Sequence, residues 1–412
     1  PLFYTYNNKE FIFASELKSI LANPAVNPKI DNEGLAEIFV MGPGRTPGHG
    51  IFKDIKELKP GHYMIYDKFE LKIKQYWSLK NKPHLDSLEE TIEKIKWLFI
   101  DTVDRQLVSD VPICTLLSGG LDSSAITSIA SESLKSSGKK QLHTYSIDYE
   151  GNQENFDANE FQPDSDDKWV NVVSDYADTV HHKIILTNEK LFEELTTGVL
   201  ARDLPGMADI DVSLYLFCKE IKKNFTVSVS GECADEIFGG YPWFHREEAL
   251  NAGTFPWAKK NNIRKKILNQ DTINYINPDQ YLKMRYQEAL AEVPTFRENM
   301  NINQKMREMF YLNLTRWMPV LLDRKDRMSM YTGLEVRVPF CDHRLVEYVW
   351  NIPWEIKNYR GMRKGIFRES LKGKLPEVIR TRPKNPYPKT FSPQYFNYTK
   401  NCLISILNDS NS

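Results

Sequence analysis

The sequence has little of what marks several protein classes. No apolar run approaches the ~20 residues that a membrane-spanning helix needs, and a formal net charge of -1 is far from the basic charge of a dedicated nucleic-acid binder. The five cysteines are scattered, without Cys-x-x-Cys or Cys/His spacing, so no zinc site is expected. An odd, unclustered set of cysteines favours the reducing cytoplasm over secretion. The sequence therefore predicts a cytoplasmic protein with neither a membrane nor a nucleic acid as partner.

The first residues also lack an initiator methionine and a signal peptide. The run from Pro1 to Tyr4 has no basic region and no cleavage site. We therefore expect a fragment, a processed chain or a chain cut from a longer one. What the sequence does have is an ordinary globular composition, with 41% hydrophobic and 26% charged residues. Its 412 residues suffice for two or three domains.

Residues 1–80 show short strand and turn patterns. Aromatic and apolar residues at 3–6 and 11–14 predict one hairpin, and a Lys-Pro-Gly-His turn at 59–62 predicts another. The Asn-Lys-Pro stretch at 81–83 has the composition of a linker. The sequence therefore predicts a small β-rich segment that a linker separates from the rest.

From about residue 86 the pattern changes to amphipathic helices and apolar strands. A helical period begins at Leu88 and continues to Val103. Strand candidates then alternate with helical segments at residues 113–117, 142–147, 182–187 and 226–230. This alternation predicts an α/β fold with a parallel sheet, in which ligands bind at the carboxyl ends of strands. Beyond residue 243 the chain is expected to be mostly helical, with a polar tail at 401–412.

A polar, acidic segment interrupts the α/β pattern at residues 151–167. It is nearly without apolar side chains. A long loop inside a compact domain is either disordered or a functional lid, and both interpretations stay open.

The most informative stretch is Ser-Gly-Gly-Leu-Asp-Ser-Ser at residues 118–124, which follows a strand candidate and starts a helical pattern. A strand, a glycine turn and a helix N-terminus in this order bind anions, because backbone amides and the helix dipole face the ligand. A Walker A loop and a dinucleotide fingerprint are excluded, because neither Gly-Lys-Ser/Thr nor Gly-x-Gly-x-x-Gly is present. The simpler alternative is a strand-to-helix turn capped by Asp and Ser.

A second strand runs into a glycine turn at residues 230–241, and this turn carries three carboxylates. If this turn lies beside the first loop, its Asp235 and the Asp122 of the first loop would be two hard oxygen ligands for magnesium. Glu232 would remain free for proton transfer. The alternative is an acidic turn on the protein surface.

A third charged stretch lies at residues 322–342. We expect its Arg327 to point at phosphate. For Glu335, Arg337 and Asp342, an ion-pair network that ties a helix to a loop is the alternative to a functional role.

The fourth stretch, at residues 380–389, carries basic side chains on a backbone that prolines stiffen. A cation held on such a loop, such as Lys384, can neutralise a leaving pyrophosphate or a tetrahedral intermediate. A solvated basic tail is the alternative.

Together these stretches resemble the asparagine synthetase family of the glutamine-hydrolysing type. The matching parts lie, in the family's order, at residues 116–124, 230–241, 326–342 and 382–390. The first is similar to the pyrophosphate loop of the ATP pyrophosphatases, which cleave ATP between the α and β phosphates. The resemblance covers about residues 86–400 and implies a parallel-sheet ATP-pyrophosphatase domain with a helical C-terminal part.

Residues 13–18 and 51–61 are similar to the last segments of the glutaminase domain that precedes the synthetase domain, a class II glutamine amidotransferase domain. In full-length members a nucleophilic cysteine opens this domain, and no residue of this chain takes that position. The resemblance therefore implies that residues 1–80 are a remnant of the glutaminase domain with its linker, and that the chain does not hydrolyse glutamine by itself.

The resemblance implies an ATP-dependent amide ligase, most simply one that makes asparagine. In that reaction ATP adenylates the side-chain carboxylate of aspartate, which gives β-aspartyl-AMP and pyrophosphate, and ammonia then displaces AMP. The implied small-molecule partners are ATP, aspartate and ammonia, with Mg²⁺ as the metal. The site must be dry, because water competes with ammonia.

By motif position, the resemblance also implies site residues. Glu232 is the expected base that takes a proton from the attacking ammonia, while Lys384 and Arg327 stabilise the phosphate and the intermediate. Asp122 and Asp235 are the expected magnesium ligands. The expected ATP-binding residues, with the first and the eighth flanking the adenine, are Leu116, Ser118, Gly119, Gly120, Asp122, Ser123, Ser124, Ile147, Ser230 and Gly231.

Three features depart from the family pattern. Cys233 stands before Ala234 where Gly-Ser or Gly-Ala is usual, Cys341 replaces a frequent leucine, and residues 202–209 do not resemble the usual aspartate-recognition segment. The acyl substrate therefore stays open between aspartate, another carboxylate, and closure of a β-lactam-type ring. More remote alternatives are an RNA-modifying ATP pyrophosphatase and an inactive scaffold. The oligomeric state also stays open, with a homodimer as one option.

Overall fold

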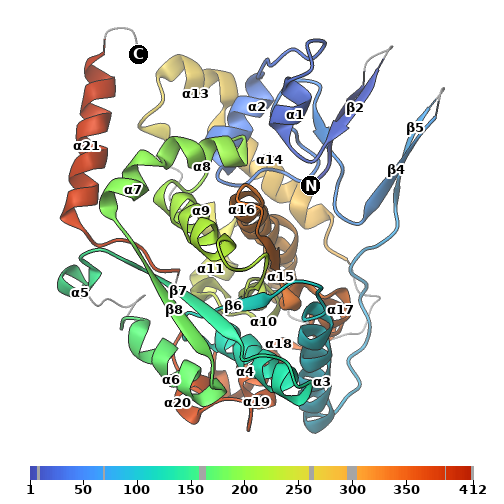
Figure 1. Cartoon of the computed structure of the whole chain (residues 1–412). Coiled ribbons are helices and arrows are strands. Elements are labelled where there is room, and N and C mark those ends of the chain that lie inside the picture. Colours follow the sequence, from blue (N-terminus) through green and yellow to red (C-terminus); the bar gives the residue numbers. More distant parts are fainter. Residues whose placement is uncertain are drawn as a thin grey trace.

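The computed structural model describes residues 1–6, 10–67, 70–156, 164–258, 264–294, 304–385 and 387–409. Five parallel strands form its central sheet: β6 (Ile113–Leu116), β7 (His143–Tyr149), β8 (Val180–Leu186), β9 (Val227–Val229) and β10 (Glu335–Arg337). Their order is β10-β9-β6-β7-β8, and β6, β7 and β8 are labelled in Figure 1. The predicted parallel α/β fold and its four predicted strands are confirmed. The fifth strand, β10, was not predicted, because its three residues lie inside a charged stretch.

Helices connect and cover these strands. Those up to the second motif are α3 (Leu88–Gln106), α4 (Leu121–Ser136), α5 (Asn152–Asn155), α6 (Asp167–Ala177), α7 (Asn188–Glu193), α8 (Leu195–Arg202), α9 (Asp209–Lys222) and α10 (Ala234–Phe238).

The chain beyond α10 is mostly helical, as predicted. Its α-helices are α11 (Glu247–Leu250), α13 (Gln270–Ile276), α14 (Pro278–Ala291), α15 (Gln304–Leu312), α16 (Met318–Met330), α17 (His343–Asn351), α18 (Trp354–Lys357), α19 (Gly365–Ser370), α20 (Glu377–Arg380) and α21 (Pro393–Asn408). Short 3-10 or π turns are η2 (Pro242–His245), η3 (Pro256–Ala258), η4 (Asn313–Trp317), η5 (Pro339–Cys341) and η6 (Tyr359–Gly361). Helix α21 extends into the stretch expected to be a polar tail. Within the described part of the chain, no helix has the length and apolar character that a membrane span requires.

Alternate side chains of β6 enter two different apolar clusters. Cys114 and Leu116 belong with α9 and β7, whereas Ile113 and Leu117 belong with α3 and α4. Since successive residues of a strand face opposite sides of a sheet, apolar layers cover both faces. The site at the ends of these strands therefore rests on a sheet that is packed on both sides.

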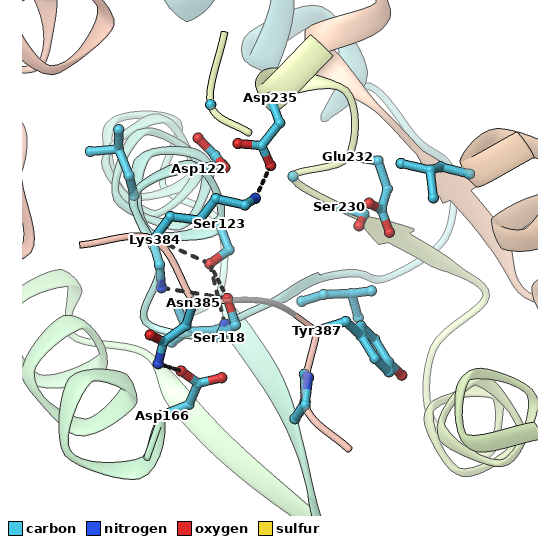
Figure 2. Close-up of a pocket in the computed structure, with 18 of the residues that line it drawn as sticks. Ser118, Asp122, Ser123, Asp166, Ser230, Glu232, Asp235, Lys384, Asn385 and Tyr387 are labelled. Carbon is cyan, nitrogen blue, oxygen red and sulfur yellow. Dashed lines mark hydrogen bonds and ion pairs between the residues drawn. The ribbon is translucent and has the colours of Figure 1, made fainter. Parts of the chain in front are cut away.

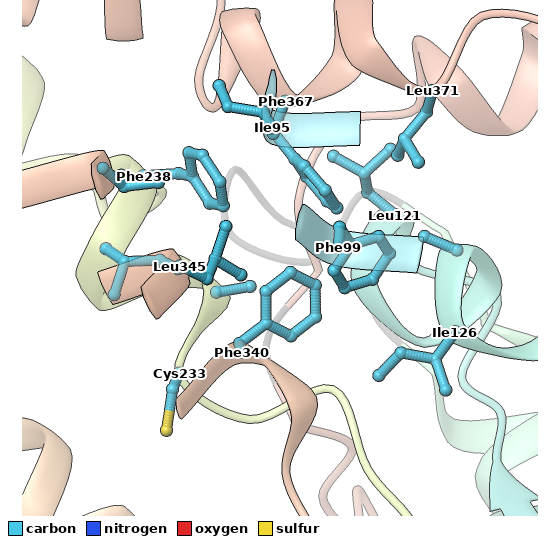
Figure 3. Close-up of a cluster of buried hydrophobic side chains, with 14 of the residues drawn as sticks. Ile95, Phe99, Leu121, Ile126, Cys233, Phe238, Phe340, Leu345, Phe367 and Leu371 are labelled. Atoms are coloured by element: carbon cyan, nitrogen blue, oxygen red, sulfur yellow. The ribbon is translucent and has the colours of Figure 1, made fainter. Parts of the chain in front are cut away.

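Three aromatic rings join distant segments in the second of these clusters. Phe99 of α3 stacks on Phe340 of η5 with ring centroids 4.7 Å apart, and Phe367 of α19 meets Phe99 edge-on at 5.1 Å (Figure 3). Aromatic contacts of this kind contribute about 0.5–1.5 kcal/mol each beyond their burial. These contacts hold η5 against the core, next to Cys233 of the second motif.

The N-terminal part forms two small sheets. One has the order β2-β1-β3, built from β1 (Phe3–Tyr6), β2 (Phe11–Ala14) and β3 (Lys56–Glu57), and the other pairs β4 (His62–Tyr66) with β5 (Leu71–Gln75). Two helices, α1 (Leu17–Leu21) and α2 (Asn32–Ala36), and the π turn η1 (Glu37–Met41) accompany them. The first predicted hairpin is confirmed, while its turn at 7–9 lies outside the described residues. The second is wrong, because the turn at 59–62 leads from β3 to β4, which belong to different sheets.

His181 of β8 gives the fold a pH-dependent element. Its Nδ1 lies 2.9 Å from Thr144 Oγ1 and its Nε2 lies 2.9 Å from Ser146 Oγ. Burial, assisted by the neighbouring His182, lowers the pKa of His181 from 6.5 to about 4. Below its ordinary pKa the unfolded chain binds a proton that the folded protein refuses, so the free energy of unfolding decreases as the pH falls from 6.5 toward 4.

We expect His181→Gln to remove part of this pH dependence. The loss of stability between pH 7 and pH 5 should become smaller by about 1 kcal/mol, a figure reduced because the ring is partly screened by solvent. Urea unfolding at the two pH values measures it. His62→Gln in the β4–β5 hairpin is the control for loss of one imidazole. Equal pH dependence in both variants would contradict the assignment.

Candidate active site

The first motif forms the turn between β6 and α4. Gly119 has φ +67, and a Cβ there would lie 2.5 Å from Trp169 Cβ, so only glycine fits. Ser123 Oγ, in the first turn of α4, accepts a hydrogen bond from Ser118 N at 3.2 Å and lies 3.1 Å from Ser118 Oγ. The motif thus folds as a tight turn that opens a 16-residue helix, the geometry that favours an anion at the helix N-terminus.

The second motif lies beside the first, because β9 pairs with β6. A Cβ on Gly231 would lie 3.0 Å from Ser123 N and 3.2 Å from Asp122 Cβ, so the two loops touch through this glycine. Cys233 then takes a left-handed φ of +79, and α10 begins at the next residue. Glu232 and Asp235 of this turn line the same pocket as Asp122 and Ser123 of the first motif (Figure 2).

Two lysines stand between the two loops. Lys364 Nζ lies 2.6 Å from Asp122 Oδ2 and 2.6 Å from Asp235 Oδ1, and Lys384 pairs with Asp235 Oδ2. Burial alone favours the neutral acid, yet the two ammonium groups outweigh it and hold the pKa of Asp235 well below its ordinary value. Asp235 is therefore a carboxylate at neutral pH.

Glu232 is also held in its charged form. Its Oε1 lies 2.9 Å from Lys325 Nζ and 3.8 Å from Arg324 Nη2, both from α16. Burial opposes ionisation, but these cations outweigh it and lower the pKa of Glu232. Glu232 is thus an ionised carboxylate beside two cations.

The two loops open into a cavity of about 510 Å³. Leu116, Ile147 and Phe217 are among its apolar lining residues, and acidic and basic side chains also line it. The predicted site residues that line it are Leu116, Ser118, Gly120, Asp122, Ser123, Ile147, Ser230, Gly231, Glu232, Asp235 and Lys384. The structure therefore brings together residues from the first, second and fourth motifs.

The fourth motif joins this cavity through several contacts. Arg382 is buried and pairs with Asp164 at 2.9 Å and Asp166 at 2.8 Å, and Asn385 Nδ2 donates to the Asp164 carbonyl at 2.9 Å. The basic segment is therefore not a solvated tail. These two aspartates end the acidic segment that was expected to be a disordered loop or a lid, of which residues 157–163 lie outside the described part.

Three predicted site residues do not line the cavity. Gly119 is the hinge of the turn, and the Ser124 side chain is fully buried without a hydrogen bond from the described residues. Arg327 is the larger error. It lies four residues after Asp323, so both occupy one face of α16, whereas Lys325 faces the cavity from another.

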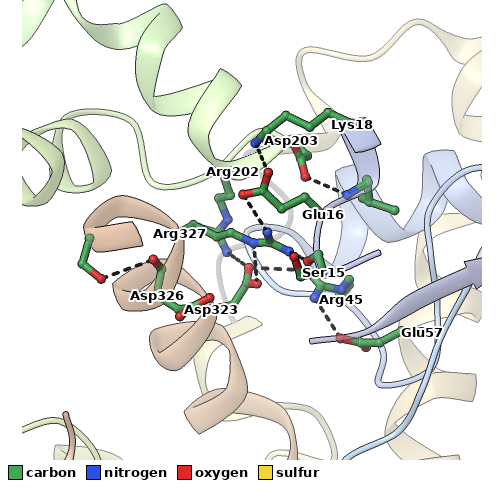
Figure 4. A network of polar contacts seen from close by, with 12 residues as sticks. Ser15, Glu16, Lys18, Arg45, Glu57, Arg202, Asp203, Asp323, Asp326 and Arg327 are labelled. Carbon is green, nitrogen blue, oxygen red and sulfur yellow. Dashed lines mark hydrogen bonds and ion pairs between the residues drawn. The ribbon is translucent and has the colours of Figure 1, made fainter. Parts of the chain in front are cut away.

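Arg327 instead belongs to an ion-pair network against the N-terminal part (Figure 4). It donates to the Ser15 carbonyl at 2.7 Å and pairs with Glu16 at 3.2 Å and Asp323 at 3.5 Å. Asp323 also forms an ion pair with Arg45 at 3.4 Å. The expectation that Arg327 points at phosphate is therefore wrong. Its guanidinium group pairs with residues that join α16 to the segment around α1.

The remaining residues of the third motif also have structural partners. Arg337 donates to the Gln106 carbonyl at 2.6 Å and pairs with Glu335 at 2.6 Å, and Asp342 accepts from Arg344 N at 2.9 Å as the cap of α17. This is the ion-pair alternative that the sequence left open.

Several cavity residues were not predicted from the sequence. They are Arg324, Lys325, Lys364, Arg363, Arg382, Asn385 and Tyr387. The run of charges at 322–327 and the basic stretch at 380–389 were signals for most of them. Lys364 lies in a stretch without any recognised motif, so only the fold places it between Asp122 and Asp235.

A parallel sheet with a Ser-Gly-Gly loop and an acidic loop on adjacent strand ends, both open to one cavity, defines an α/β domain of the ATP-pyrophosphatase type. The asparagine synthase family model matches residues 94–412, and the glutamine amidotransferase domain model matches residues 1–77. The chain belongs to the asparagine synthase family, whose members are carbon–nitrogen ligases, and the resemblance expected from the sequence is confirmed.

Individual relatives agree with this assignment. Glutamine-hydrolysing asparagine synthetase 3 of Bacillus subtilis is 50% identical over 412 residues, which is 100% of this chain and 67% of that protein. Glutamine-hydrolysing asparagine synthetase 1 of the same organism is 27% identical over 94% of this chain and 63% of its own length. The chain thus spans about two thirds of these relatives. Among solved structures, a U34-tRNA thiolase of Methanococcus maripaludis covers 76% of this chain and 89% of its own at 14% identity, but its TM-score of 0.25 is too low to carry an argument.

Proposed function

We propose that this chain carries the ligase site of an enzyme that makes asparagine from aspartate, ATP and ammonia through β-aspartyl-AMP. The observation that carries the proposal is the pair Asp122 and Asp235 on adjacent strand ends, with Lys364 between them and Lys384 against Asp235, all lining one cavity. A polyanion that binds with a divalent cation fits such a row of alternating charges.

The cavity supports an assignment of the parts of ATP. The apolar side chains of Leu116 and Ile147 would flank the adenine, and Ser118 and Ser123 would cradle phosphate at the start of α4. Lys384 reaches the same place from the fourth motif and would receive the leaving pyrophosphate.

Magnesium fits the two carboxylates. Asp122 Oδ1 is buried and accepts no hydrogen bond from the described residues, and Asp235 Oδ1 lies 2.6 Å from Lys364 Nζ, a contact that a metal ion would replace. Among those residues no group of three or more His, Cys, Asp or Glu side chains could hold a metal ion, so two carboxylates plus phosphate oxygens are the expected ligands. When bound, magnesium would neutralise phosphate charge and leave Lys364 free to pair with the nucleotide.

The chemistry then proceeds in two displacements. A carboxylate oxygen of the acyl substrate attacks the α-phosphorus, and pyrophosphate leaves as the acyl-adenylate forms. Ammonia next attacks the acyl carbon and AMP leaves, which requires that the nitrogen lose a proton. Glu232 is the carboxylate placed for that proton, and Lys325 and Arg324 hold it in position.

The choice of aspartate rests on family membership and not on a recognised pocket. The atypical segment at 202–209 does not line the cavity. Arg202 forms a buried pair with Asp211 at 3.1 Å, and Asp203 accepts from Leu17 N at 2.8 Å. This segment therefore serves the contact with the N-terminal part, and amidation of another carboxylate stays the alternative.

The test is to mix the chain with ATP, Mg²⁺, ammonium and aspartate and to measure pyrophosphate and asparagine. Equal amounts of the two products support the proposal. Pyrophosphate that depends on another carboxylate indicates a different acyl substrate, and no aspartate-dependent pyrophosphate contradicts the proposal.

The N-terminal part offers a surface for a glutaminase domain, in the same protein or as a separate chain. Large apolar side chains are exposed on its strands and just after β5, among them Phe13 of β2 at 62%, Ile65 of β4 at 50% and Tyr76 at 70%. We propose that this face is covered in the active glutamine-dependent enzyme. Cytoplasmic location stays a prediction from the sequence, and the oligomeric state stays open.

Two matched variants separate a cavity cation from a structural one. Lys384→Met should weaken binding of MgATP by about tenfold or more, because it removes a charge-assisted contact. Arg327→Met should leave that affinity within about twofold. It should lower the free energy of unfolding by about 1–3 kcal/mol, because the contacts of Arg327 with Ser15 and Glu16 are lost. The loss stays in this range because Asp323 keeps Arg45 and Arg202 as partners. Titration calorimetry and urea unfolding measure the two effects. A large loss of affinity in Arg327→Met would restore its predicted contact with phosphate.

A further inference from the structure

Two cysteines from distant parts of the chain meet where the second motif contacts η5. Cys233 Sγ lies 2.7 Å from Cys341 Sγ, although 108 residues separate them in sequence. These are also two positions at which the sequence departs from the family pattern. Cys114 and Cys218 are buried in the apolar cluster around α9, and Cys402 is exposed on α21. Only one pair among the described cysteines is therefore in contact.

The geometry leaves little distance for a bond to close. A disulfide has an S–S length of about 2.05 Å, so the two sulfurs need to approach by less than 1 Å. Cys233 is buried, whereas Cys341 is partly exposed at the end of η5. An oxidant from solvent reaches Cys341 first, and Cys233 is the thiol within reach of the product.

We propose that Cys233 and Cys341 are a redox-active pair that closes to a disulfide and slows the ligase. With a hydroperoxide as oxidant, Cys341 sulfur attacks the peroxide and the O–O bond breaks, which gives a sulfenic acid and water. Cys233 sulfur then attacks that sulfur, the S–O bond breaks, and a second water leaves with the proton of Cys233. The two thiols lose two electrons, which reduce hydrogen peroxide to two waters. A dithiol reductant reverses the bond by exchange.

Anchoring of η5 directs the movement to the catalytic loop. Phe340, the residue before Cys341, is fully buried against Phe99 at 4.7 Å and Phe367 at 5.3 Å (Figure 3). Asp342, the residue after it, is fixed as the cap of α17. The approach of the two sulfurs therefore shifts Cys233.

That shift is transmitted to Glu232, the residue before Cys233. Glu232 depends on a 2.9 Å contact with Lys325, and Asp235 lies two residues beyond Cys233. Closing the bond therefore displaces the groups to which we assign proton transfer and magnesium binding. This effect on rate rests on the proposed function, whereas formation of the disulfide does not.

The experiment treats the whole chain with hydrogen peroxide, blocks remaining thiols with iodoacetamide, and maps the peptides by mass spectrometry with and without dithiothreitol. We expect a peptide pair linked through Cys233 and Cys341, with free thiols falling from five to three. Amide formation should fall by about tenfold or more, since a misplacement of ~1 Å can cost up to ~100-fold, and dithiothreitol should restore it.

Three variants complete the test. Cys341→Leu and Cys233→Gly should each remove the cross-link and the sensitivity of the rate to peroxide, and Cys402→Ser should keep both. Glycine is chosen at position 233 because φ there is +79. Oxidation confined to Cys402, or irreversible sulfonic acid at Cys341, overturns the proposal. A mapped disulfide with an unchanged rate of amide formation overturns the claim that the bond disturbs the site. If the reduced chain makes no amide, the proposed function fails, while the peptide map still decides the disulfide.

Discussion

Asp235→Asn is expected to lower pyrophosphate release by about 100-fold or more. Asp235 pairs with two lysines, Lys364 at Oδ1 and Lys384 at Oδ2, and lines the cavity beside Asp122. Asparagine keeps the shape but removes the charge, so Lys364 and Lys384 lose their shared partner and magnesium loses one of two expected ligands. Losing one preorganised electrostatic contact at a reacting centre costs about 100- to 1000-fold.

The measurement is pyrophosphate release with saturating aspartate and ammonium over a range of magnesium concentrations. Asp148→Asn is the matched control, because Asp148 lies on β7, pairs with Lys183 at 2.9 Å and does not line the cavity. Asp122→Asn should resemble Asp235→Asn, and the double variant should lose little more, since residues that act as a unit are not additive. An unchanged rate in Asp235→Asn at every magnesium concentration would remove the metal site.

The two loops were predictable because their signals are local. A buried strand, a glycine turn and a helix start within a dozen residues fix the shape at Gly119 and at Cys233 with little help from elsewhere. The rule that ligands bind at the carboxyl ends of parallel strands puts both loops at one edge of the sheet but does not make them neighbours. The pairing of β6 with β9 then placed Asp122 beside Asp235.

The site features that could not be predicted from the sequence depend on contacts between distant segments. Lys364 has no motif around it, and only the packing of the helical part delivers it to Asp122, 242 residues away. The charged stretch around Arg327 was expected to supply a site residue, but its sequence does not say which side chains of α16 face the cavity, so Lys325 was missed and Arg327 was assigned in error. Cys233 and Cys341 were each noted as unusual, yet nothing in sequence says that they touch.

Glu232→Gln is expected to separate the two chemical steps. Glutamine is nearly the same shape as glutamate and can still accept a hydrogen bond, but it takes no proton. Pyrophosphate formation should therefore stay within about tenfold, while amide formation falls by about 100-fold or more, in the range that general-base catalysis provides. Rapid-quench measurement of pyrophosphate and amide in one turnover gives both rates. Equal loss of the two would exclude Glu232 as the base.

The pH dependence of amide formation gives an independent check through the cations that hold Glu232. Because Lys325 and Arg324 lower the pKa of Glu232, this group limits the rate only at pH values below the ordinary glutamate pKa of about 4.3. Lys325→Met removes the 2.9 Å contact, so burial then raises the pKa of Glu232 and the rate should decline at a higher pH as the solution is acidified. Arg327→Met on the same helix should leave the profile unchanged. If Lys325→Met lowers the rate equally at all pH values, Lys325 binds substrate and does not set the charge of Glu232.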